Sequence, residues 1–206
     1  MLDLAHPAAA FGLGVALGTS PGPVQLLLFS EASSGGVARG LRAMAGANGT
    51  FGAMLALLAA GLSSFRPGPG LLRVVQVVGG AFLVFLAIDA VRESRRPPVE
   101  GAAPRRTGLH PALRGAVAVV LNPGVYVFLA TTGAAVAADA ASDGGRALAF
   151  VTVGALLLGV SLSDSAMVLV GAGAHRVRPG ILRIVSDVLA GALAALGAVL
   201  IVRGLA

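Results

Sequence analysis

Long uncharged runs of apolar residues alternate with short polar segments along the 206 residues of the chain. A run of about 18 or more apolar residues with few charges is typical of a transmembrane helix. Six runs predict six spans, at residues 8–30, 41–62, 71–91, 115–136, 147–171 and 181–202. The pattern therefore predicts an all-α polytopic membrane protein.

The polar segments between these runs are short, except for residues 92–114, which hold six arginines and four prolines. This segment is expected to be a basic cytoplasmic linker between two halves of three spans each, residues 1–91 and 115–206. Because each half contains an odd number of spans, the two halves lie in opposite orientations. The predicted organisation is thus two inverted three-helix repeats.

The arginines are distributed unequally between the two sides of this topology. Eleven of them lie in or beside the segments that connect the first span to the second, the third to the fourth and the fifth to the sixth. The opposite side carries only Arg66, Arg73, Arg146 and Arg203. Cytoplasmic loops carry the excess of basic residues in membrane proteins. We therefore expect a multi-pass protein of the bacterial cytoplasmic (inner) membrane with both termini outside. The N-terminus lacks the basic region of a signal peptide, so the first span is expected to be retained.

Composition narrows the function classes further. Charged residues make up 12% of the chain, about half of what a soluble domain carries. The net charge of +6 is explained by loop arginines, so no nucleic-acid partner is expected. The absence of cysteine excludes disulfides and thiolate metal sites. The three histidines lie far apart, and no catalytic triad or phosphate loop is evident, so we expect no metal, no cofactor and no enzyme activity.

Two spans contain prolines where a continuous helix is expected. Pro21-Gly22-Pro23 interrupts the first span, and Asn122-Pro123-Gly124 interrupts the fourth at the corresponding place, 102 residues later. A proline inside a helix removes a hydrogen bond and frees carbonyl groups, which need partners in protein or in a water-filled cavity. Matched breaks in two halves of a membrane protein indicate a transporter binding site. The alternative is that the prolines only shape helix packing.

Four polar side chains are expected near these breaks, in the cytoplasmic half of the membrane: Gln25, Asn48, Asn122 and Tyr126. With both breaks, they predict one substrate-binding cavity open to the cytoplasm. N–H groups after Pro23 are expected to bind a substrate carboxylate, and carbonyls before Pro21 to bind an ammonium group.

Asp164 is the only charged residue of the fifth predicted span. A carboxylate within the membrane is costly and marks a functional site by default, and burial favours its protonated form. Ser161 and Ser165 share its helix face. We expect these three residues to handle a proton or ion, the alternative being a structural hydrogen bond to freed carbonyls. Glu31, directly after the first span, is expected at the membrane boundary.

These motifs resemble the LysE-type (lysine exporter) amino-acid exporters over nearly the whole chain. The resemblance rests on Pro21-Gly22-Pro23, on residues 79–86 and on Asn122-Pro123, and it is that of a divergent member, since Val24 and Gly124 depart from the family pattern. The resemblance implies export of amino acids or small derivatives, driven by the proton or ion gradient.

The sequence thus favours a secondary transporter whose partners are a small-molecule substrate and membrane lipid, with a homo-oligomer allowed. A non-transport scaffold or assembly subunit is the alternative, and a membrane enzyme comes third. A scaffold does not need polar groups at one depth in several helices.

Overall fold

The computed structural model describes residues 5–20, 22–61, 69–94, 109–173 and 179–205, and every regular element in these segments is helical. The all-α prediction is therefore confirmed. The elements are α1 (Ala5–Thr19), α2 (Pro23–Ala59), α3 (Pro69–Ser94), α4 (Pro111–Val120), α5 (Pro123–Phe128), the π-helix η1 (Leu129–Gly133), α6 (Ala134–Gly173) and α7 (Pro179–Leu205).

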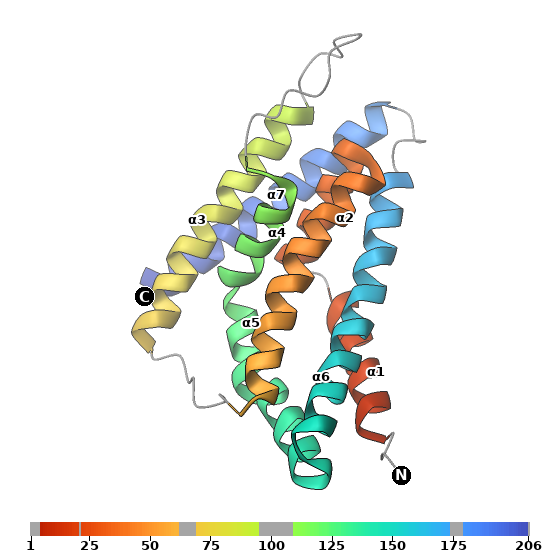
Figure 1. Cartoon of the computed structure of the whole chain (residues 1–206). Helices are drawn as coiled ribbons and strands as arrows, with labels where there is room; N and C mark the ends of the chain where they lie inside the picture. The colour runs from red at the N-terminus through yellow and green to blue at the C-terminus, as the bar shows by residue number, and fades with distance from the viewer. Residues whose placement is uncertain (1–4, 21, 62–68, 95–108, 174–178, 206) are drawn as a thin grey trace.

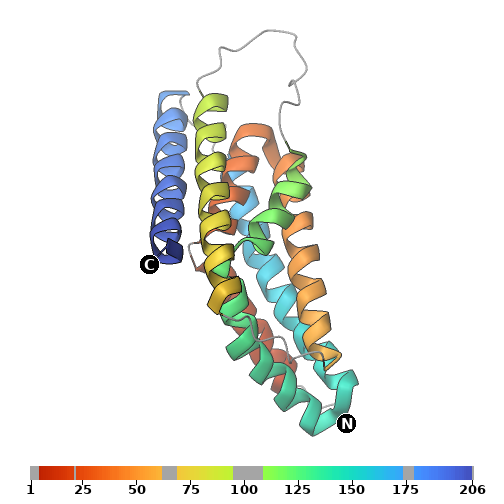
Figure 2. The same ribbon diagram turned by 90° about the vertical axis from the view of Figure 1, so that its left-hand side faces the viewer.

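The helices form one elongated bundle with two ends (Figures 1 and 2). One end holds the last turns of α3 and the first turns of α4 and α7, and we call it the linker end. The first residues of α1 and α3 and the last of α2 lie at the opposite end. The connections thus alternate between ends, as the predicted spans require.

Two glycine pairs reverse the chain without any loop. In α2, Gly36 has φ 73° and ψ −175°, and in α6, Gly145 has φ 70° and ψ −171°. This backbone region is accessible essentially only to glycine, and other residues adopt it at a cost of about 1–3 kcal/mol. Figure 1 shows α2 turning back at the linker end and α6 at the opposite end.

These reversals correct the expected span boundaries. The predicted loops at residues 31–40 and 137–146 are instead helical up to the glycine pairs. Charged side chains such as Asp139 and Arg146 do not end the helix, because they are exposed. Only a residue that accepts positive φ reverses the chain here.

Helices pair closely where glycine replaces a side chain. A methyl group at Gly14 of α1 or at Gly159 of α6 would collide with backbone of the partner helix, and Gly46 of α2 and Gly115 of α4 are equally tight against each other's helix. Small residues allow this close approach. The resulting pairs are α1 with α6 and α2 with α4, while α3 packs on α7 and α2 on α6.

Length and apolar composition alone identify fewer spans than the sequence pattern predicts. Among the described residues, the stretch Pro123–Gly173 is long and apolar enough to cross a membrane. Helices α1 and α2 also qualify if they are counted as one span across their 66° bend. Shorter apolar helices are Arg73–Ile88, Pro111–Val120 and Ala190–Leu205.

Candidate functional site

The first helix break lies between α1 and α2. Pro21 itself is outside the described residues, but both flanks are defined. Helix α2 begins at Pro23. The residue before it, Gly22, has an extended backbone (φ −153°, ψ 178°) and no side chain that could cap the helix. The early N–H groups of a helix need an outside partner. The start of α2 is therefore a helix N-terminus without a capping side chain.

The last turn of α1 supplies its own hydrogen-bond donors. The hydroxyl groups of Thr19 and Ser20 each donate to the Ala16 carbonyl at 3.0 Å, and the Ser20 N–H donates to Leu17 O at 3.2 Å. Two of the carbonyls before Pro21, those of Ala16 and Leu17, thus already accept hydrogen bonds. The sequence alone did not reveal this, because the hydroxyl rotamers depend on where α1 ends.

The second break, between α4 and α5, is closed by its own side chains. Asn122 Oδ1 accepts from the Gly124 N–H at 3.0 Å, and the Tyr126 hydroxyl donates to Val120 O at 2.7 Å. A normal helix would join those two backbone groups to each other. Pro123 is buried at the start of α5. Tyr126 thus stabilises the break, and neither it nor Pro123 is among the residues that line the cavity.

Both breaks open into one cavity of about 260 Å³. Six of the residues predicted for the site line it: Gly22, Pro23, Gln25, Asn48, Asn122 and Asp164. Much of the remaining wall is apolar, and the rings of Phe51 and Phe128 lie there with their centroids 6.0 Å apart. The sequence thus predicted most polar groups of this cavity, whereas its apolar wall could not be separated from ordinary helix packing.

Asp164 is the one charged side chain among the described residues that line the cavity. It is 1% exposed. Gln25 Nε2 donates to its Oδ1 at 3.4 Å, and within the described part of the chain its Oδ2 has no hydrogen-bond partner. The side chain of Asn48 also interacts with this carboxylate, but no described lining residue supplies a cation. Burying a carboxylate without a paired cation is strongly unfavourable. This oxygen is therefore the group in the cavity with the greatest need of a ligand or a proton.

The two serines predicted as partners of Asp164 bond elsewhere. Ser161 Oγ accepts from Asn48 Nδ2 at 3.0 Å, and Ser165 Oγ donates to the Ser161 carbonyl at 2.7 Å. They share a helix face with Asp164, as expected, but Ser161 bonds to α2 and Ser165 bonds to the backbone of its own helix. The structural alternative was a hydrogen bond from Asp164 to freed carbonyls. Among the described residues, the observed hydrogen bond of Asp164 is instead one that it accepts from Gln25 of α2.

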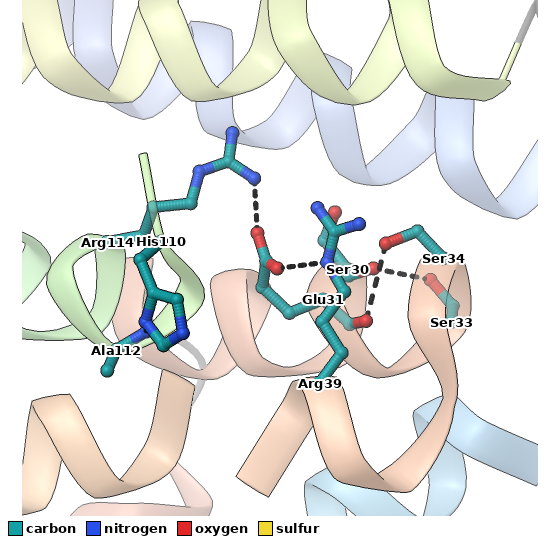
Figure 3. Close-up of polar contacts among 8 residues, drawn as sticks. All are labelled: Ser30, Glu31, Ser33, Ser34, Arg39, His110, Ala112 and Arg114. Carbon is teal, nitrogen blue, oxygen red and sulfur yellow. Dashed lines mark hydrogen bonds and ion pairs between the residues drawn. The ribbon is translucent and has the colours of Figure 1, made fainter. Parts of the chain in front are cut away.

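An ionic cluster at the linker end was not predicted from the sequence. Glu31, expected at the boundary, is only 2% exposed and contacts Arg39 and Arg114. Figure 3 shows its carboxylate between the two guanidinium groups. The one available signal was an isolated acidic residue beside an apolar run. Its partner Arg114 lies 83 residues away in the sequence.

Comparison with known proteins identifies the family. A model of the LysE type translocator family matches residues 15–204, which is nearly the whole chain. No curated protein and no solved structure was found to match. The matched region contains both helix breaks, the cavity and the ionic cluster, and it bears out the resemblance seen in the motifs. The protein therefore belongs to the LysE type translocators, a family of membrane transporters of amino acids or similar molecules.

Proposed function

We propose that the protein exports amino acids or small amino-acid-like metabolites across the cytoplasmic membrane, coupled to the proton or ion gradient. The observation that carries this proposal is the cavity into which both helix breaks and the carboxylate of Asp164 open. Transporter sites of this kind are built from discontinuous helices near the middle of the membrane. Family membership supports the same reading.

The substrate carboxylate binds at the start of α2. Gly22 provides no capping side chain, and Val24 and Gln25 line the cavity there. A helix N-terminus attracts anions through its N–H groups and its dipole. The matching terminus of α5 is less available, because the Asn122 side chain already accepts from Gly124.

The substrate ammonium group binds Asp164 Oδ2. We favour Asp164 over the carbonyls before Pro21, because those of Ala16 and Leu17 already accept hydrogen bonds from Thr19 and Ser20. A proton and the substrate ammonium group then compete for the carboxylate of Asp164. Because the two cannot bind together, substrate movement is coupled to the proton gradient. Asn48 holds Ser161 beside this site.

The packing pattern supports two repeats, residues 1–91 and 115–206, joined by the linker 92–114. In two equivalent halves, α1 corresponds to α4 and α2 corresponds to α6. The contact of α1 with α6 then has the contact of α4 with α2 as its counterpart, and both contacts are present. The glycine reversals of the two halves also have nearly the same backbone angles. Opposite orientation follows from the odd number of spans in each half.

Export is tested by preloading cells with a panel of amino acids and dipeptides and measuring efflux. We expect accelerated efflux of α-amino acids, because the cavity offers one group for each charge of a zwitterion. The matched acid without an amino group and the amine without a carboxylate should leave at the rate of cells lacking the protein. Equal export of all three compounds would contradict the proposed site.

The topology is tested with single cysteines, which suit a chain that has none. With the linker in the cytoplasm and both termini outside, Ser142→Cys should react with an impermeant thiol reagent in intact cells. Ser94→Cys, beside the linker, should react only after the membrane is opened. The reverse labelling pattern would invert the topology.

A further inference from the structure

Glu31 holds two arginines at the linker end of the bundle. Its Oε2 lies 2.6 Å from Arg39 Nε, and its Oε1 accepts a hydrogen bond from Arg114 Nη1. Arg114 is 5% exposed, so one of the two ion pairs is almost completely buried. Figure 3 shows that α2 contributes Glu31 and Arg39, whereas Arg114 comes from α4.

The two pairs connect different parts of the chain. Arg39 lies eight residues after Glu31, just beyond the glycine reversal of the same element. Arg114 lies 83 residues after Glu31, in α4, although the sequence pattern placed it at the end of the linker. The pair of Glu31 with Arg39 is therefore local, whereas the pair of Glu31 with Arg114 ties the first segment of α2 to α4.

Both tied segments line the cavity, together with α1, the second segment of α2, α5 and α6. Helix α2 reaches it at Gln25, six residues before Glu31, and α4 reaches it at Val119, five residues after Arg114. At 1.5 Å per residue, the ion pair lies roughly 8–9 Å along each helix from the cavity, toward the linker end. A molecule that entered between these segments would have to separate them.

The charge arrangement allows such a separation. A buried charge that loses its partner is strongly destabilised. If α4 moves away, Glu31 still keeps Arg39, and Arg114 is in the first turns of α4, close to the bundle end. Opening thus leaves no buried carboxylate without a cation.

The opposite end of the bundle has a related contact. His6 Nε2 lies 2.9 Å from Asp143 Oδ2, which joins the first turn of α1 to the residue before the glycine reversal of α6. At each end, the start of the first helix in one half thus contacts the region of the reversal in the other half. This contact is exposed, so the two ends differ in how firmly they are tied.

We propose that the pair of Glu31 with Arg114 is an ionic latch that closes the substrate cavity at the linker end, and that transport requires it to open while the pair with Arg39 stays intact. The role of this latch in transport depends on the proposed function. Its effect on access to the cavity is measurable without any substrate.

The test compares Arg114→Gln with Arg39→Gln, in each case on a background that carries the reporter Val119→Cys in the cavity. Each variant removes one of the two cationic partners of the Glu31 carboxylate, but only Arg114→Gln removes the ion pair with α4. The measurement is the rate at which a small impermeant thiol reagent labels the reporter from the linker side of membrane vesicles. Ser94→Cys identifies that side.

Arg114→Gln should raise the labelling rate about tenfold or more, as expected for a shift in the population of the open form. Arg39→Gln should leave the rate near that of the unaltered cluster. Equal rates in the two variants, or no change in either, would overturn the latch. If Arg114→Gln does not reach the membrane, Arg114→Lys against Arg39→Lys decides in the same way. Absent amino-acid efflux with intact Arg114 would contradict the proposed function alone, because labelling needs no substrate.

Discussion

Asp164→Asn should abolish gradient-driven efflux, a loss on the order of a hundredfold, while the protein still inserts and exchanges substrate. The amide keeps the size of the side chain and one acceptor oxygen, but it cannot bind a proton. Replacing a charge-assisted hydrogen bond by a neutral one should weaken substrate binding by roughly 10- to 100-fold. Exchange of labelled for unlabelled substrate should therefore persist when the substrate concentration is raised accordingly.

The pH dependence of exchange separates coupling from a structural role. A proton on Asp164 excludes the ammonium group, so exchange by the unaltered protein should weaken as the pH falls, and in Asp164→Asn this dependence should vanish. Asp139→Asn is the matched control, since Asp139 lies on the same helix but is exposed. A variant with reduced expression or thermal stability and normal transport per molecule would make Asp164 structural. Normal efflux with the original pH profile would end the coupling proposal.

Pro21→Ala combined with Pro23→Ala should abolish transport and leave insertion intact. A proline in a helix interior costs about 3 kcal/mol, so its removal favours a continuous helix through the first span. The start of α2 then no longer presents N–H groups to the cavity. We expect efflux to fall to that of cells without the protein, and thermal stability to stay equal or rise.

The second Pro-Gly-Pro of the chain is the matched control for this experiment. Pro67→Ala combined with Pro69→Ala makes the same chemical change elsewhere. Pro69 is the first residue of α3, a position that accepts proline and other residues alike. This control should transport normally. Undiminished efflux from the first double variant would remove the main basis for the binding site.

Asparagine and tyrosine at the second break illustrate the limit of predicting roles from residue type. Asn122 and Tyr126 were expected to bind substrate, because polar groups beside a broken helix often do. In the structure, each side chain bonds to one of the two backbone groups, Gly124 N–H and Val120 O, that a continuous helix would join, and Asn122 also lines the cavity. The expectation placed both residues at the break, but their roles depend on rotamers that the sequence does not specify.

Glu31 and Asp164 show the same limit for charged residues. Both are isolated acidic residues beside or within an apolar run, and both are almost completely buried. Glu31 is neutralised by two arginines, whereas the described side chains that interact with Asp164 are the uncharged amides of Gln25 and Asn48. The difference arises because α4 brings Arg114 to one carboxylate and no described lining residue brings a cation to the other.

The sequence by itself determined the helical class, the positions of both helix breaks and most polar residues of the cavity. Apolar run length and the backbone chemistry of proline are local properties, and each residue carries them wherever it lies. Only the tertiary structure decided which of these polar groups stay available to a substrate. Hydrogen bonds and ion pairs join residues distant in sequence, such as Gln25 with Asp164 and Glu31 with Arg114. Their partners depend on helix packing, which glycine contacts between α1 and α6 and between α2 and α4 bring about.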